Sequence, residues 1–224
     1  MKAKQILFIV LIISFNFAMS QKRIYIDEKG DTLSKSEIKP KLNKLGNTLN
    51  SWTYIGKDGK KYIKLSDKVY LKGNFDYEMI KTEIEKITNL ELADSVTIII
   101  QYYYKDDFCT DERKDNVWSR GEINRRKSFI KPIKKFINAK DMFFISLFEK
   151  GIELKNKKNN EYFFSDENNF FRDNIFLNPT TCGSYAAIKS NGETLIRNGE
   201  YRADWFSNHL IDENWSLFFN DEKD

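Results

Sequence analysis

The sequence predicts a mixed α/β fold in which helices flank a sheet and an N-terminal extension is rich in β-hairpins. Residues 96–104 read VTIIIQYYY and are almost continuously β-branched or aromatic, which is typical of a strand buried on both faces. Two segments with helical spacing of apolar residues, 77–87 and 118–139, lie on either side of this strand in the sequence. A second apolar run follows at residues 142–148, and this alternation of strands and helices indicates the α/β class.

The first twenty residues have the layout of a secretory signal peptide. Two lysines precede a largely apolar run at residues 6–17, and the small residues Ala18 and Ser20 fit a peptidase site after Ser20. The alternative, a retained membrane anchor, needs roughly 20 apolar residues, whereas this run is shorter and is broken by Asn16. We therefore expect residues 1–20 to be removed from an exported protein, periplasmic or extracellular, that has no stable membrane insertion after cleavage.

The mature chain is expected to carry little net charge. Cleavage leaves 224 less 20, or 204 residues, and loss of Lys2 and Lys4 lowers the formal net charge from +4 to +2. The densest basic stretch, residues 125–135, also carries apolar residues at helical spacing, including Phe129. This pattern indicates an amphipathic helix with a solvated basic face, and we expect no nucleic-acid partner.

The mature chain is predicted to consist of an N-terminal extension at residues 21–75 and an α/β domain at residues 76–224. Alternating residues at 24–33 and 52–65 predict two hairpins, the second of which turns at Asp58-Gly59. Between them, Ser34 and Glu37 have capping-box spacing at the start of a helix.

The second half of the α/β domain is predicted to hold further short elements. Residues 166–176 are expected to form a short helix, residues 185–196 a hairpin that turns at Asn191-Gly192, and residues 201–210 a last helix. In that last helix Tyr201 and Trp205 are four apart, so we expect both to pack on the sheet rather than to form a binding site.

From residue 96 onward, the order is strand, helix, strand, helix, two hairpin strands and helix, and it resembles the thioredoxin-like superfamily over about residues 76–212. In that family the first buried strand leads to a redox cysteine at the start of a helix, and a proline before the third strand lies beside it. Cys109 lies in the matching loop, and Pro179 precedes the third strand. The redox members carry Cys-x-x-Cys, but Glu112 stands where the second cysteine would be.

The resemblance also implies a Cys109–Cys182 disulfide, because it places Cys182 near the loop of Cys109. An even cysteine count in an exported protein favours pairing, and a bridge across 73 positions would stabilise the fold by about 4 kcal/mol. Free buried thiols and a working redox pair are the alternatives. Acidic residues beside Cys109 oppose thiolate formation and so favour the structural bridge. These acidic residues are Asp106, Asp107, Asp111 and Glu112.

Other candidates for chemistry carry weaker signals. His209 is the only histidine, and we expect it near a helix C-terminus or on the surface. The acidic loop at residues 106–115 could bind calcium or supply an acid–base pair, but its spacing matches no EF-hand, and a solvated loop is expected. We expect neither a metal nor a cofactor.

The sequence leaves open whether the protein is an enzyme. One interpretation is a non-catalytic scaffold or binding domain with a structural disulfide, acting on an unknown protein or small-molecule partner. The other is a thiol-disulfide oxidoreductase or thiol peroxidase in which Cys109 is the nucleophile and Cys182 the resolving thiol. A third interpretation is that residues 96–210 form an α/β domain of another topology.

Overall fold

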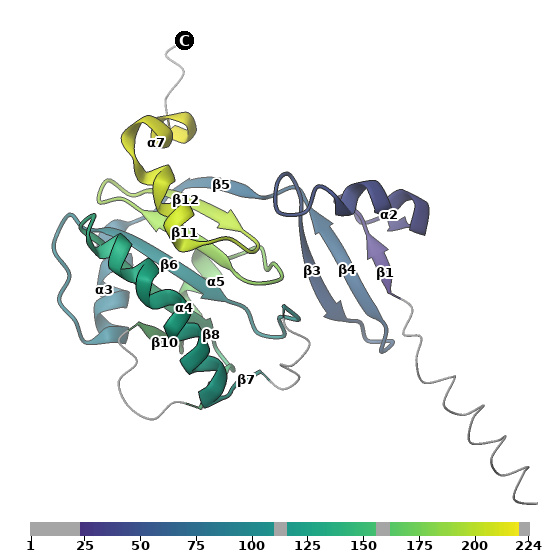
Figure 1. Cartoon of the computed structure of the whole chain (residues 1–224), viewed down its shortest axis with the longest axis horizontal. Helices are drawn as coiled ribbons and strands as arrows, with labels where there is room; N and C mark the ends of the chain where they lie inside the picture. Colours follow the sequence, from purple (N-terminus) through teal and green to yellow (C-terminus); the bar gives the residue numbers. More distant parts are fainter. Residues whose placement is uncertain (1–22, 110–115, 156–161, 220–224) are drawn as a thin grey trace, which may run out of the picture.

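The computed structural model describes residues 23–109, 116–155 and 162–219, which form two separate sheets and a two-stranded ribbon (Figure 1). The predicted signal peptide lies outside the described residues. Among the residues that are described, no helix combines the length and the apolar character needed to cross a membrane.

The N-terminal residues form a four-stranded sheet with the order β2-β1-β4-β3. Both predicted hairpins are confirmed, and the capping box of Ser34 and Glu37 is present at the start of the helix. The hairpins are joined by parallel pairing of β1 with β4, which the sequence did not indicate. The elements are β1 (Ile24–Ile26), β2 (Thr32–Leu33), α2 (Lys35–Leu42), β3 (Asn50–Ile55) and β4 (Lys61–Ser66).

The larger sheet has six strands in the order β10-β8-β6-β11-β12-β5. Its central strand β6 runs parallel to β8 and antiparallel to β11, which forms a hairpin with β12. The strands are β5 (Tyr70–Asn74), β6 (Thr97–Tyr103), β8 (Met142–Glu149), β10 (Phe163–Asp166), β11 (Ser184–Ile188) and β12 (Glu193–Asn198). The short strands β7 (Val117–Trp118) and β9 (Glu153–Leu154) pair separately.

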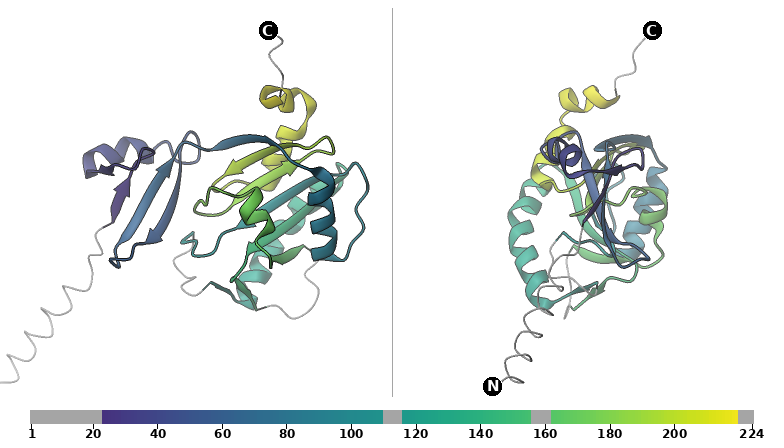
Figure 2. Two further views of the ribbon diagram at one scale, coloured as in Figure 1. Left: turned by 180° about the vertical axis from the view of Figure 1, so that it is seen from behind. Right: turned by 90° about the vertical axis from the view of Figure 1, so that its right-hand side faces the viewer.

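Helices cover both faces of the larger sheet, which gives three layers (Figures 1 and 2). One apolar core packs α4, α6 and α7 against the sheet, and the other packs α3 and α5 against the opposite face. The helices are α3 (Tyr77–Thr88), α4 (Arg120–Asn138), α5 (Phe170–Asn174), α6 (Ala203–Phe206), the 3-10 turn η1 (Ser207–Leu210) and α7 (Asp212–Phe219). The succession from β6 to α6 confirms the expected thioredoxin-like α/β architecture.

Two predicted helices differ from the structure. Residues 166–176 do not form one helix, because Asp166 ends strand β10 and Asn169 adopts a left-handed φ of 56° before α5 begins. The expected helix at residues 201–210 is divided into the short helix α6 and the 3-10 turn η1. A left-handed residue such as Asn169 cannot continue a right-handed helix, so only Phe170–Asn174 remain helical in the first segment.

Hydrogen bonds join the N-terminal sheet, and the turn that precedes β3, to the larger sheet and its loops. The amide of Thr181, just before β11, donates to the carbonyl of Ser51 on β3 at 2.8 Å. Arg197 on β12 is 1% exposed, and its Nη2 donates to the carbonyl of Gly46 at 2.6 Å. Strand β5 lies within residues 21–75, the predicted N-terminal extension, but it pairs in the larger sheet. The division of the chain into an extension and an α/β domain at residue 75 stays a prediction.

His209 lies in η1 and is half-buried among aromatic rings. Its Nε2 lies 3.3 Å from the hydroxyl oxygen of Tyr70, and its ring stacks on Tyr201 with centroids 6.2 Å apart. Burial lowers the pKa of His209, and the positive charge of Arg197 lowers it further. The charged imidazolium is therefore less stable in the folded protein than in the unfolded chain.

We predict that this histidine makes the protein less stable in acid. Because the unfolded chain binds the proton more readily, the free energy of unfolding falls as the pH drops below the unfolded value of about 6.5. Urea unfolding at pH 7.5 and pH 5.5 should show a larger acid loss for the wild type than for His209→Gln. Equal losses for the two proteins would contradict the burial of this ring.

Candidate functional site

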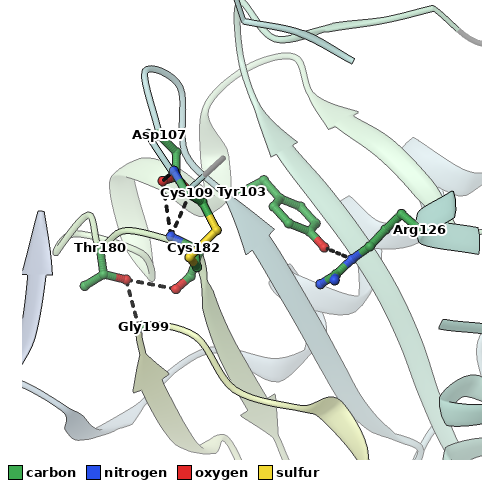
Figure 3. Close-up of a disulfide and its surroundings, with 8 residues drawn as sticks. Tyr103, Asp107, Cys109, Arg126, Thr180, Cys182 and Gly199 are labelled. Atoms are coloured by element: carbon green, nitrogen blue, oxygen red, sulfur yellow. Dashed lines mark hydrogen bonds between the residues drawn. A yellow bond between two sulfur atoms is a disulfide. The ribbon is translucent and has the colours of Figure 1, made fainter. Parts of the chain in front are cut away.

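The two cysteines meet beside the central strand. Strands β6 and β11 are antiparallel neighbours that pair Tyr102 with Ser184, so the chain leaving β6 lies next to the chain entering β11. Cys109 follows the first strand and Cys182 precedes the second (Figure 3). Their Cα atoms are 4.7 Å apart and their sulfurs are bonded, which confirms the expected disulfide.

The loop that carries Cys182 is held tightly against its surroundings. The hydroxyl of Thr180 donates to the carbonyl of Gly183 at 2.8 Å and accepts the amide of Gly199 at 2.8 Å (Figure 3). Cys182 itself has a left-handed φ of 72°. Pro179 lies farther from β11, and no peptide bond among the described residues is cis. Cys182 and Gly183, rather than a proline, therefore lead directly into the strand.

Asp107 connects the two cysteine loops by accepting hydrogen bonds from both. Its Oδ1 accepts the backbone N–H of Cys109 at 2.9 Å, and its Oδ2 accepts the backbone N–H of Cys182 at 2.9 Å (Figure 3). The residue is 7% exposed, so this carboxylate is not part of a solvated loop as the sequence suggested. A buried acceptor shared by both loops keeps them in register across the disulfide.

Of the remaining acidic candidates, Asp106 alone lies within the residues that the structure describes. Asp106 exchanges two hydrogen bonds with Asn116, at 2.6 Å and 2.7 Å. Asp111, Glu112 and Asp115 lie outside the described residues. Within the described ranges, no group of three potential ligands is placed to hold a metal ion.

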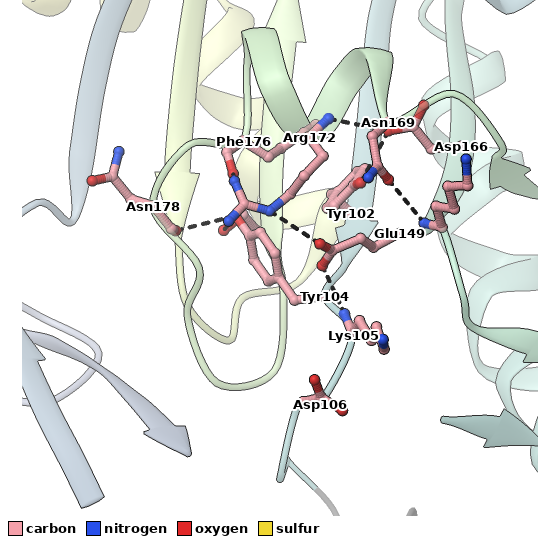
Figure 4. Close-up of polar contacts among 12 residues, drawn as sticks. Tyr102, Tyr104, Lys105, Asp106, Glu149, Asp166, Asn169, Arg172, Phe176 and Asn178 are labelled. Carbon is pink, nitrogen blue, oxygen red and sulfur yellow. Dashed lines mark hydrogen bonds and ion pairs between the residues drawn. The ribbon is translucent and has the colours of Figure 1, made fainter. Parts of the chain in front are cut away.

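A polar network on the face of the larger sheet that α5 covers fixes the start of the Cys109 loop (Figure 4). Glu149 accepts the backbone N–H of Lys105 at 2.8 Å and pairs with Nε of Arg172 at 3.3 Å. Burial raises the pKa of Glu149, although these two contacts act against the rise. Asp166 is fully buried, accepts the Tyr102 hydroxyl at 3.0 Å, and also has a pKa that burial raises.

A cleft of about 590 Å³ adjoins the disulfide, between the first half of α4 and the segment around α6. Gln101, Tyr103 and both cysteines contribute to it from the sheet and its loops. Trp205 lines the cleft and is 53% exposed, so the expectation that it packs on the sheet is wrong. The helix expected there is too short to bury that ring, and α6 presents it to the cleft instead.

Arg126 extends from α4 into this cleft. Its Nε donates a 2.6 Å hydrogen bond to the hydroxyl of Tyr103, as Figure 3 shows. Its guanidinium carbon lies 5.4 Å from the centre of the Tyr103 ring and 5.0 Å from that of Phe129. The buried Gln101 side chain lines the same cleft and donates to the Tyr185 hydroxyl at 2.6 Å.

Sequence reasoning missed the importance of Arg126 because it assigned the arginine to a solvated basic face. It also placed Phe129 on the buried face of the helix, whereas Phe129 and Phe136, two turns further along, are 46% and 41% exposed. The buried stripe is made by isoleucines alone, which narrows the apolar face and leaves the phenylalanines at its margin. The buried isoleucines are Ile123, Ile130, Ile133 and Ile137.

Neither a family model nor a curated protein matches this sequence. Two solved structures are similar to it, both with a TM-score of 0.35 and 10% sequence identity. The exposed lipoprotein thioredoxin Etrx1 from Streptococcus pneumoniae strain TIGR4 is covered over 97% of its length, against 71% of this chain. The N-terminal domain of PilB from Neisseria gonorrhoeae is covered over 97%, against 62% of this chain. In this chain β6 is parallel to β8 and antiparallel to β11, which is the strand arrangement expected of a thioredoxin-like α/β fold.

We predict that Gly183→Ala severely destabilises the protein. Gly183 has a φ of +82°, and an added Cβ would lie 2.4 Å from the carbonyl oxygen of Tyr102 on the central strand. We expect a loss of about 3 kcal/mol in the free energy of unfolding, because backbone strain and overpacking act together.

The matched control is Gly59→Ala in the β3–β4 turn. Gly59 has a similar φ of +73° but open space at the Cβ position, so only the strain of about 1–2 kcal/mol applies. Both free energies can be measured by denaturant unfolding. Equal losses would show that the close approach of Gly183 to β6 does not matter.

Proposed function

We propose that this chain is a non-catalytic thioredoxin-like binding domain, in which the Cys109–Cys182 disulfide is structural and the adjoining cleft holds a partner. The observation that carries this proposal is the position of Asp107, whose carboxylate accepts the amides of both cysteines. A negative charge at this place opposes thiolate formation at either sulfur after reduction.

The backbone around the cysteines supports the same reading. A reactive thiolate is commonly stabilised by free backbone N–H groups or by a helix N-terminus. Here the amides of both cysteines are already used by Asp107, and the next helix among the described residues, α4, begins at Arg120. The bridge instead links the exit of β6 to the entry of β11, where Thr181 also bonds to the N-terminal sheet.

A thiol-disulfide oxidoreductase or thiol peroxidase is the second candidate. It is favoured by one observation: both cysteines line the cleft and are only partly buried. In the oxidoreductase reaction, the Cys109 thiolate would attack a partner's disulfide, and Cys182 would then displace the reduced partner. Two electrons and two protons would pass to the partner as the Cys109–Cys182 bond re-formed.

We also infer that the mature protein begins after Ser20 and works outside the cytosol. The layout of residues 1–20 supports this inference, and a disulfide in the fold fits an oxidising compartment. Mass spectrometry of the protein in periplasmic and medium fractions would test it. A full-length chain retained in the cytosol would contradict both the cleavage and the export.

We predict a strongly reducing potential for the disulfide, below about −300 mV, as is typical of structural bridges. The double variant Cys109→Ser, Cys182→Ser should lose about 4 kcal/mol of stability, because the unfolded chain is no longer constrained. Redox equilibration with dithiothreitol and denaturant unfolding would measure the two quantities. A potential near −200 mV, together with turnover of a disulfide substrate, would instead establish the second candidate.

We further predict that Asp107→Asn lowers the pKa of the thiols in the reduced protein. The amide oxygen of asparagine still accepts hydrogen bonds, but the negative charge that opposes a thiolate is gone. The pH dependence of iodoacetamide alkylation would report the pKa, with Asp106→Asn as the control for an exposed neighbour. If both variants matched the wild type, the carboxylate would have no electrostatic effect on the thiols.

A further inference from the structure

We propose that the cleft is a site for an organic anion, in which Arg126 binds a carboxylate and the exposed rings of Phe129 and Trp205 contact a flat apolar group attached to it. This inference rests on the proposed binding function and adds the chemical class of the ligand. It is carried by the guanidinium of Arg126, whose hydrogen-bonding capacity is only partly used.

The unused hydrogen-bond donors of Arg126 are the N–H groups of its two Nη atoms. Only Nε is engaged, by the hydroxyl of Tyr103, and neither Nη atom forms a hydrogen bond or an ion pair with any residue that the structure describes. The pair of terminal N–H groups of a guanidinium matches the two oxygens of a carboxylate in a bidentate arrangement. Arg126 is therefore suited to bind a carboxylate.

The arginine is held in place before any ligand binds. Tyr103 is 5% exposed, and its ring stacks on Phe148 with centroids 4.7 Å apart and meets Trp118 edge-on at 5.0 Å. A rigid tyrosine thus fixes one end of the guanidinium, while Phe129 lies 5.0 Å from its carbon. Preorganisation of this kind reduces the entropy that binding must offset.

The walls of the cleft suit the apolar part of such a ligand. Phe129 on α4 and Trp205 on α6 are about half exposed, and both line the cleft. Each ring has an arginine nearby, because Arg202 lies 5.0 Å from the Trp205 ring just as Arg126 lies near Phe129. The volume of about 590 Å³ is that of an ordinary small-molecule site.

The partners of the charged residues around the cleft leave Arg126 as the group suited to an anion. The carboxylate of Glu122 forms the capping box of α4, where it accepts the backbone N–H of Ser119 at 2.8 Å. Arg202 is paired with Asp204 through contacts of 2.7 Å and 3.0 Å. Among the lining residues that the structure describes, Arg125 and Arg126 then stand beside Glu122 and Glu200, so the net charge is balanced and the preference for an anion comes from the unused Nη donors of Arg126.

The same chemistry can come from a free aromatic carboxylic acid or from the C-terminal carboxylate of a peptide that ends in an aromatic residue. Two probe sets separate these sources. The first contains indole-3-acetate and 2-naphthoate with their uncharged amides. The second contains tripeptides ending in tryptophan with either a free or an amidated C-terminus.

Saturation-transfer NMR on the mature protein would compare each acid with its amide. We expect the acids to bind at least about tenfold more tightly, and Arg126→Gln to abolish this preference. Arg126→Lys should retain part of it, because the charge remains while the planar pair of donors is lost. Arg120→Gln removes the same charge from the same helix outside the cleft and should leave the preference unchanged.

The proposal is overturned if no acid in either set binds, if acids and amides bind equally, or if Arg126→Gln keeps the preference while circular dichroism shows it folded. Should acids and amides bind equally, with both lost in Trp205→Ala, the binding function stands and only the anion assignment fails. Should the disulfide turn over a substrate, the proposed function fails even where the carboxylate preference is found.

Discussion

Burial of β6 between β8 and β11 is the constraint on which the rest of the structure depends. Ile98, Ile99 and Ile100 are fully buried, and both edges of the strand are paired along its length. The parallel neighbour requires the crossover through α4, and the antiparallel neighbour brings the chain back beside the exit of β6. The cleft and the disulfide both lie at that exit, so their positions follow from the pairing of one strand.

The alternation of side chains along β6 places three consecutive tyrosines on different faces of the sheet, where they make different contacts. Tyr102 and Tyr104 face the core that contains α5, where their hydroxyls meet Asp166 and Ser184 at 3.0 Å each. Tyr103 faces the opposite core and positions Arg126 in the cleft. Because successive residues of a strand point to opposite faces, one segment supports the loop network and the candidate site together.

The sequence predicted features that depend on local chemistry. The central strand, the turns at Asp58-Gly59 and Asn191-Gly192, and the capping box of Ser34 follow from propensity and spacing, and the structure contains them. The disulfide came from a resemblance that placed Cys182 near Cys109. The role of Asp107 and the open face of Arg126 could not be predicted, because both depend on which side chains meet across elements far apart in the sequence.

The N-terminal part of the chain is connected to the cleft through the buried charge of Arg197. Arg197 is 1% exposed, and burying a charge is costly unless protein groups replace the water molecules that would otherwise solvate it. The carbonyl of Gly46, in the turn between α2 and β3, does so on one side, and the rings of Tyr70 and Tyr201 lie 5.5 Å and 4.6 Å from the guanidinium carbon. Tyr201 is also a wall of the cleft. The turn before β3 therefore supports the candidate site without lining it, because its Gly46 carbonyl bonds to Arg197, and the Arg197 guanidinium packs against the Tyr201 ring that lines the cleft.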